Sequence, residues 1–203
     1  MIKEAVNRFK TGGVVIFPTD TVYGIGCTIS KKRAVRKIYK IRRDKPTKPQ
    51  LILVSSINQA FKYGFFDELA KKFAKMFWPG PLTVVVRARA KVPKSIRSQG
   101  ETVGIRMPNQ PPLLEIIRQV GEPILAPSAN FHGKKAPASF TKIDKKLLAL
   151  VDYAINFRRL PGGFEMSKEP STVVDLTKQP YQVIRPGAIA SEKLKKAVEE
   201  PRK

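Results

Sequence analysis

The chain has 203 residues, is 42% hydrophobic and carries a formal net charge of +23 at pH 7, so it is long enough for one domain with a sizeable core. No apolar run approaches the roughly 20 residues that a membrane-spanning helix needs, and the charged N-terminus has no signal-peptide pattern, which predicts a soluble cytoplasmic protein. One Cys and one His are too few for a Cys/His zinc site and for an internal disulfide.

Short runs rich in Val and Ile alternate with longer amphipathic segments along the chain, which is the pattern of an α/β fold. The predicted strands cover residues 14–17, 51–54, 83–87, 102–106, 123–126, 153–157, 171–175 and 182–185. The predicted helices cover residues 2–11, 31–43, 67–77, 112–120, 141–150 and 191–199. We find no internal repeat and no low-complexity linker, so we expect one domain over residues 1–203.

Polar residues adjoin three of the predicted strands. The sequence PTDT follows the first strand, PSAN (127–130) follows the fifth, and PST (170–172) leads into the seventh. Ligands collect at strand ends in α/β sheets, so these loops predict a shared polar pocket. The alternative is that they only close turns. We expect Pro18 to end the first strand, and Gly24 and Gly26 to let the chain turn close to a ligand.

The helix predicted over residues 31–43 has an apolar face and a basic face. The apolar residues are Ala34, Val35, Ile38 and Ile41. The basic residues are Lys32, Arg33, Arg36, Lys37, Lys40 and Arg43. Together with the net charge, the basic face makes nucleic acid, nucleotide and acidic membrane the candidate partners. The alternative is a solvated face that serves only solubility.

Further cations lie where helices or strands end. They are Arg42, Arg43, Lys45 and Lys48 after the second helix, and Arg106 and Arg185 at the ends of strands. An Arg at a strand end can hold a carboxylate or phosphate with two parallel hydrogen bonds, although a surface Arg on an edge is the alternative. The chain lacks a P-loop, a full dinucleotide glycine pattern and G-x-S-x-G. We therefore expect chemistry by positioning and charge neutralisation, as in phosphoryl or nucleotidyl transfer.

One pair of side chains could instead carry nucleophilic catalysis. Cys27 and His132 are the single cysteine and the single histidine of the chain. The alternative is a small buried Cys at a strand end.

Seven motifs occur in order along the chain: FPTDTVYGIG, the basic segment ending in KP, FWPGPLT, TVGIRMP, APSAN, PSTVVDL and VIRPGAI. In this order they resemble the YrdC-type threonylcarbamoyl-AMP synthases over roughly residues 10–190. The resemblance implies a twisted open mixed sheet flanked by helices, with a large basic concave cavity, in the single-domain form of the family. It also implies an activity: L-threonine, bicarbonate and ATP, with Mg²⁺, give threonylcarbamoyl-adenylate and pyrophosphate. A partner transferase then modifies tRNA with the threonylcarbamoyl group.

The same resemblance implies roles for individual residues. Threonine contacts fall on Thr21, Arg106, Ala126 and Ser171, with Arg106 as the clamp for the carboxylate. ATP contacts fall on Lys48, Thr102, Ser128, Asn130, Ala136 and Arg185. Arg42, Arg43 and Lys48 are the catalytic cations, and no protein side chain is assigned to a metal. Thr19 and Tyr23 shape the pocket wall and Asp20 braces the loop.

The chain departs from the family pattern at three positions. Arg42 stands where the family has a lysine, Asp44 where it has an arginine, and Leu53 where a histidine is common. A shift of one residue would put Arg43 at the arginine position, and Lys40-Ile41-Arg42 offers another register. Two other functions stay open: an RNA-binding module without nucleotidyl transfer, and carbamoyl transfer in hydrogenase maturation, whose zinc-type Cys motifs these residues lack.

Overall fold

The computed structural model describes residues 1–44, 49–156, 166–167 and 169–199. Its helices are α1 (Ile2–Lys10), α2 (Lys32–Arg42), α3 (Ile57–Phe61), α4 (Glu68–Phe77), α5 (Pro111–Val120), α6 (Lys145–Leu148) and α7 (Ser191–Glu199), with a 3₁₀ turn at Phe140–Lys142. Its strands are β1 (Val15–Pro18), β2 (Tyr23–Thr28), β3 (Leu51–Leu53), β4 (Leu82–Arg87), β5 (Thr102–Arg106), β6 (Ile124–Leu125), β7 (Tyr153–Ala154), β8 (Thr172–Asp175) and β9 (Gln182–Arg185).

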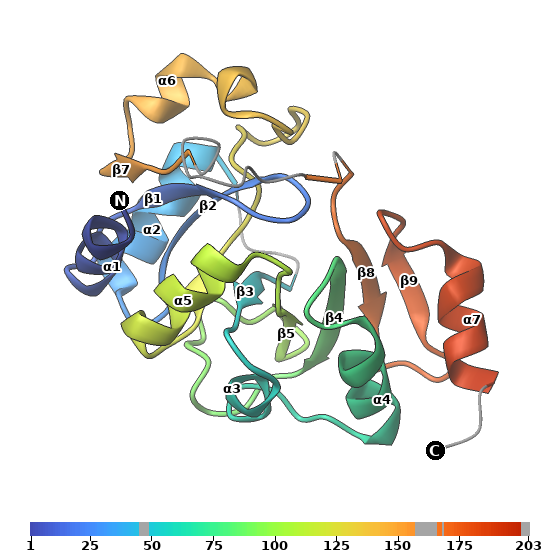
Figure 1. The fold of residues 1–203 in the computed structure, drawn as a ribbon. Helices are drawn as coiled ribbons and strands as arrows, with labels where there is room; N and C mark the ends of the chain where they lie inside the picture. The colour runs from blue at the N-terminus through green and yellow to red at the C-terminus, as the bar shows by residue number, and fades with distance from the viewer. Residues whose placement is uncertain (45–48, 157–165, 168, 200–203) are drawn as a thin grey trace.

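The strands form one twisted sheet in the order β7-β1-β2-β6-β3-β5-β4-β8-β9 (Figure 1). The pairs β1/β7, β3/β5 and β4/β8 are parallel, and the other neighbouring pairs are antiparallel. The predicted mixed α/β fold with helices flanking the sheet is therefore confirmed.

Alternation of side chains along the strands builds two hydrophobic cores, one on each face of the sheet. In β1, Ile16 packs in the core that contains residues of α2, α4, α6 and α7. Its neighbours Val15 and Phe17 pack in the second core, with residues of α1 and α5. Both cores are completely enclosed at these positions, since all three side chains are 0% exposed. None of the helices in the described ranges combines the length and apolarity needed to cross a bilayer.

The structure corrects the prediction for residues 23–28. We expected glycine turns here, but YGIGCT forms β2, which is buried along its whole length and pairs with β1. Gly24 and Gly26 therefore serve packing rather than turning. A Cβ on Gly26 would lie 2.2 Å from the carbonyl oxygen of Leu125 and 2.8 Å from the ring of Phe17.

Three other elements differ from the prediction. The short helix α3 was not predicted; Ser56 caps it by accepting from the backbone N–H of Gln59. The predicted helix 141–150 is wrong as one element, because extended backbone at Ile143 separates the 3₁₀ turn from α6, which Asp144 caps anew. The predicted strand 153–157 shortens to β7, and its last residue lies outside the described ranges.

The close approach of Leu125 predicts a strict size limit at position 26. Gly26→Ala should lower the free energy of unfolding by about 3 kcal/mol, because the added methyl must push β6 or Phe17 away. Gly100→Ala is the control, since a Cβ there meets only the Ser98 hydroxyl at 3.7 Å. Urea unfolding of both variants checks this, and equal stabilities would contradict the packing role.

Candidate active site

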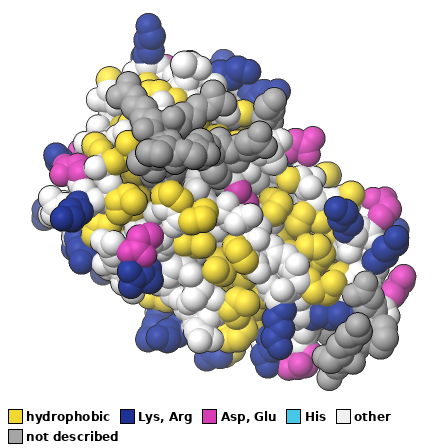
Figure 2. Space-filling model, in the orientation of Figure 1, with side chains coloured by type: hydrophobic (Ala, Val, Ile, Leu, Met, Phe, Trp, Pro, Cys, Tyr) yellow, Lys and Arg dark blue, Asp and Glu magenta, His cyan; other side chains and the backbone are white. Residues whose placement is uncertain are grey.

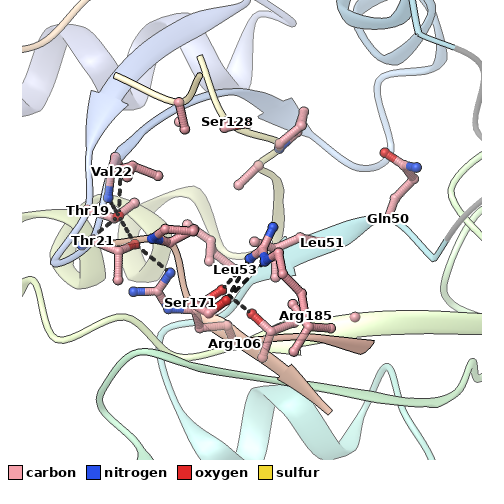
Figure 3. Close-up of a pocket in the computed structure, with 18 of the residues that line it drawn as sticks. Thr19, Thr21, Val22, Gln50, Leu51, Leu53, Arg106, Ser128, Ser171 and Arg185 are labelled. Carbon is pink, nitrogen blue, oxygen red and sulfur yellow. Dashed lines mark hydrogen bonds between the residues drawn. The ribbon is translucent and has the colours of Figure 1, made fainter. Parts of the chain in front are cut away.

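One cavity of about 300 Å³ opens on the sheet face that carries α1 and α5, within the size range of small-molecule sites. Alternate residues of neighbouring strands form its floor: Leu51 and Leu53 of β3, Thr83 and Val85 of β4, Gly104 and Arg106 of β5, and Val173 of β8. The PTDT, PSAN and PST loops contribute Thr19, Thr21, Ser128, Asn130, Pro170 and Ser171 to its walls (Figure 3). The three polar loops therefore share a pocket, as the sequence predicted.

Arg106 is buried at the end of β5, and protein acceptors hold its guanidinium in place. Its Nε donates to the carbonyl of Gly80 at 3.0 Å, one terminal nitrogen donates to the hydroxyl of Thr21 at 2.9 Å, and the other contacts Asp20 at 2.5 Å. Burial lowers the pKa of Arg106, and the Asp20 carboxylate opposes that shift. These contacts use three of the five N–H bonds of an arginine, so the described hydrogen bonds of Arg106 leave two of its N–H bonds for a ligand.

The PTDT loop is organised by the hydroxyl of Thr19. That oxygen donates to the carbonyl of Val22 at 2.7 Å and accepts from the backbone N–H groups of Thr21 and Val22. It also lies 2.9 Å from the Thr21 hydroxyl, which in turn accepts from Arg106 (Figure 3). The loop thus presents Thr21 to the cavity in a fixed position, and Asp20 braces the arrangement from behind.

A second arginine, Arg185 of β9, lies beside Arg106. It donates to the carbonyl of Ser171 at 2.8 and 3.1 Å and to the Ser171 hydroxyl at 3.0 Å, and that hydroxyl lies 2.8 Å from Thr83 Oγ1. Burial, and then the positive charge of Arg106, lower the pKa of Arg185. None of the ion pairs among the described residues includes Arg185, so an anion between the two arginines would relieve their repulsion.

Arg42 lines the opposite part of the cavity, but its guanidinium faces protein oxygens. One nitrogen contacts the carbonyl of Ser128 and donates to the Asn130 carbonyl at 2.8 Å. The other lies 3.5 Å from Asp44, whose second oxygen is 3.3 Å from Nδ1 of His132. Burial lowers the pKa of Arg42 and Asp44 opposes this. Arg42 therefore braces the PSAN loop and is partly neutralised there.

Most of the predicted site residues meet at this cavity. Those that line it are Thr21, Arg42, Arg106, Ala126, Ser128, Asn130, Ala136, Ser171 and Arg185. Arg43 and Thr102 do not line it. Arg43 follows α2 and holds its guanidinium over the Phe131 ring, and the Thr102 hydroxyl hydrogen-bonds with the Ser98 hydroxyl at the start of β5. Lys45 and Lys48 lie outside the described ranges. The role of each residue stays a prediction.

The prediction missed several lining residues, among them Gln50, Thr83, Gly104 and Lys134. The sequence could have indicated Thr83 and Gly104, because each alternates with buried apolar residues along a central strand and so faces the other side of the sheet. Among the described residues that line the cavity, the positively charged ones are three arginines and Lys134, and the one carboxylate is that of Asp44. That the cavity is basic overall stays a prediction.

Two further expectations concern metals and cysteine chemistry. The described residues contain no group of three or more His, Cys, Asp or Glu side chains that could hold a metal ion. Cys27 is enclosed in the core of the sheet face opposite the cavity. Burial, and then Glu122, raise the pKa of its thiol to about 12. These observations favour the buried structural Cys over a Cys27–His132 catalytic pair.

The buried Arg106–Asp20 pair predicts a large stability effect. Asp20→Ala should lower the free energy of unfolding by about 3 kcal/mol or more, because it leaves the Arg106 charge buried without its carboxylate. Glu4→Ala breaks the exposed Arg8–Glu4 pair and should cost less than about 1 kcal/mol. Denaturant titrations of the two variants check this; similar losses would contradict the account.

The raised pKa predicts an inert thiol. Alkylation requires the thiolate, and the raised pKa and the burial of Cys27 keep the thiolate fraction low and the sulfur enclosed, so the folded protein should react far more slowly than the unfolded chain at every pH from 7 to 9. The unfolded chain should react readily and faster with rising pH. Labelling with iodoacetamide, followed by mass spectrometry, measures both rates. Rapid modification of the folded protein would contradict the buried location.

Known proteins resemble this chain in sequence and in fold. The Sua5_yciO_yrdC family model, described as telomere recombination, matches residues 7–187. A Methanocaldococcus jannaschii protein, provisionally named threonylcarbamoyl-AMP synthase, is 37% identical over 95% of this chain and 86% of its own length. The threonylcarbamoyl-AMP synthase of Pyrococcus abyssi is 34% identical over 99% of this chain.

Two solved structures share the fold. P. abyssi Sua5 complexed with L-threonine superposes with a TM-score of 0.90 over 99% of this chain, at 34% identity. The chain spans only 58% of that protein. Escherichia coli YciO superposes with a TM-score of 0.85 at 28% identity, over 95% of this chain and 92% of its own. The family model covers most of the sequence, so the predicted resemblance is confirmed and the chain belongs to the Sua5/YciO/YrdC family.

Proposed function

We propose that this chain is a threonylcarbamoyl-AMP synthase, a nucleotidyltransferase that condenses L-threonine, bicarbonate and ATP. The observation that carries the proposal is the pair Arg106 and Arg185, adjacent on the cavity wall beside the hydroxyls of Thr21, Ser171 and Thr83. Such a wall suits a small polar substrate with a carboxylate. Relatives named for this activity, and the threonine complex of one of them, support the assignment.

Arg106 is the proposed clamp for the threonine carboxylate. Its contacts to Asp20, Thr21 and Gly80 fix the guanidinium before substrate arrives, so little conformational freedom is lost on binding. Ser171 and Ala126 complete the threonine side. Leu53, at the position where the family resemblance implies a histidine, lies in the cavity floor and packs in the core with α1 and α5. Amino-acid recognition in this chain therefore depends on Arg106 and the hydroxyls.

The reaction needs no covalent enzyme nucleophile. The amine of threonine attacks the carbon of bicarbonate and water leaves, which gives a carbamate. A carbamate oxygen then bonds to the α-phosphorus of ATP while the bond to the β-phosphate oxygen breaks and pyrophosphate leaves. The protein contributes by holding the reactants together and by placing positive charge near the phosphates. Ser128, Asn130, Ala136 and Arg185 are the proposed ATP contacts among the described residues.

Magnesium belongs to this proposal as the companion of ATP. Asp44 is the single carboxylate on the described cavity wall, and it already lies against Arg42 and His132. These residues do not form a magnesium site of the protein, so no protein ligand is assigned and no step depends on one. Delivery of the product to a tRNA-modifying partner and a cytoplasmic location are part of the same proposal.

The proposed activity is tested by following isotopically labelled carbon from bicarbonate into the adenylate product. Labelled carbon should enter an adenylate only when ATP and L-threonine are both present, with matching release of pyrophosphate. Arg106→Ala should raise the KM for threonine by about 10- to 100-fold, the loss of a hydrogen bond to a charged group. Arg118→Ala, an exposed arginine on α5, is the control. Absence of labelled adenylate would refute the activity, and an unchanged threonine requirement in Arg106→Ala would refute the clamp.

A further inference from the structure

The floor of the candidate active site carries two buried hydroxyls in direct contact, those of Thr83 and Ser171. Thr83 lies on β4 and is 3% exposed, and Ser171 precedes β8 and is 2% exposed. Their oxygens are 2.8 Å apart. The proposed reaction assigns a threonine contact to Ser171 alone. The protons of the pair, however, decide which of the two hydroxyls can reach a substrate.

The neighbours of Thr83 fix the direction of its hydroxyl. Its methyl carbon is the atom nearest to the position that a Cβ on Gly104 would take, at 3.2 Å, so the glycine on β5 leaves space beside this methyl. Threonine is stiff at its first side-chain torsion. With the methyl on the β5 side, the hydroxyl therefore turns toward β8 and Ser171. Thr83 thus holds its hydroxyl in one orientation on the lining of the cavity.

The pair has a proton to spare. A hydroxyl has a single proton to donate, and arginine can only donate, so Ser171 Oγ is the acceptor in its 3.0 Å hydrogen bond with Arg185. The contact between Ser171 and Thr83 uses the proton of one of them. Among the described hydrogen bonds of the pair, the other proton has no acceptor. A buried polar group that lacks its partner costs free energy, and a ligand oxygen in the cavity would remove that cost.

The shared proton can belong to either oxygen. If Thr83 donates to Ser171, then Ser171 has the proton that faces the ligand. If Ser171 donates to Thr83, a chain of hydrogen bonds runs from the Arg185 cation through Ser171 to Thr83, and Thr83 has the proton that faces the ligand. Hydrogen bonds aligned in one direction polarise and strengthen one another. Because this chain begins at a positive charge, an anionic ligand oxygen favours the second arrangement.

The surroundings of the pair select a carboxylate. Arg106, Ser171 and Arg185 lie together in the cavity (Figure 3), and the positive charge of Arg106 lowers the pKa of Arg185. On the face of the molecule that Figure 2 shows, Lys and Arg side chains lie mostly around the margin and hydrophobic side chains gather nearer the centre. A small anion that both cavity arginines attract therefore lies against the hydroxyl pair, within reach of its spare proton.

We propose that Thr83, rather than Ser171, donates the hydroxyl hydrogen bond to the carboxylate of threonine, between Arg106 and Arg185. Ser171 still completes this side of the site, but it acts through Thr83 as a positioning residue, because it accepts from Arg185 and donates to Thr83. The identity of the amino acid rests on the proposed function. The choice of donor rests on the geometry of the hydroxyls and on the charge at the start of the chain.

The test compares dissociation constants for L-threonine, measured by isothermal titration calorimetry without ATP. Thr83→Val keeps the shape of the side chain and should weaken binding by about 10-fold or more, the loss of a hydrogen bond to a charged group. Thr83→Ser restores the hydroxyl and should recover most of the affinity. Ser171→Ala leaves Thr83 its proton and should weaken binding less than Thr83→Val. Unchanged affinity in Thr83→Val, or a larger loss in Ser171→Ala, would overturn the proposal.

Two controls separate donation to the carboxylate from a structural effect. Thr28→Val removes a buried hydroxyl that donates to the carbonyl of Phe9 at 2.6 Å and is not on the described cavity lining. It should lower the free energy of unfolding and leave the affinity for threonine unchanged. L-Threoninol has an alcohol in place of the carboxylate, so the penalty of Thr83→Val should shrink with this probe. An equal penalty would put the Thr83 bond on another part of the ligand and overturn the proposal.

Adenylate formation from labelled bicarbonate distinguishes this proposal from the proposed function. A chain that binds L-threonine through Thr83 but forms no adenylate would refute the activity and leave the donor assignment intact. A chain that forms adenylate, with the same KM for threonine in Thr83→Val as in the parent, would refute the donor assignment alone.

Discussion

The buried guanidinium of Arg106 is the constraint on which the site depends. A charge enclosed at the end of β5 costs several kcal/mol unless acceptors surround it. Asp20 and Thr21 come from the loop after β1, and Gly80 comes from the loop before β4. Satisfying one side chain therefore fixes three segments that are far apart in the sequence. The same contacts hold the guanidinium of Arg106 in one orientation on the lining of the cavity.

The cations of the cavity have different tasks. Arg42 donates to the carbonyl of Asn130 and lies near Asp44, so its charge supports the PSAN loop. Arg185 has hydroxyl and carbonyl partners on Ser171 but no described carboxylate, and Arg106 repels it. The account therefore assigns anion binding to the Arg106–Arg185 side. Asp44 stands where the family resemblance implies an arginine, and its carboxylate makes the opposite end of the cavity less attractive to phosphates.

The sequence predicted the elements whose signals are local. Val- and Ile-rich runs marked most of the strands, and amphipathic periodicity marked α1, α2, α4, α5 and α7. The sequence did not predict β2, because Gly24 and Gly26 interrupt its apolar run. Glycine is needed at these positions because Phe17 and Leu125, which belong to other strands, approach them closely.

The sequence predicted that strand-end loops form the site. It did not predict which side chains hydrogen-bond or pair with one another there. That Arg106 would pair with Asp20 across 86 positions of sequence depends on the order of strands in the sheet. The orientation of Arg42 toward Ser128 and Asn130 likewise depends on where the PSAN loop crosses the end of α2. In the sequence, both arginines were candidate binding residues because of their charge. The tertiary structure shows that Arg42 supports the PSAN loop, and it places Arg106 on the lining of the cavity.

A crystal structure of the chain with L-threonine and a non-hydrolysable ATP analogue tests the central claim most directly. The account predicts the threonine carboxylate within hydrogen-bond distance of Arg106, with the contacts of that arginine to Asp20 and Gly80 unchanged. Threonine bound elsewhere, or an Arg106 that must leave Asp20 to reach it, would contradict the account.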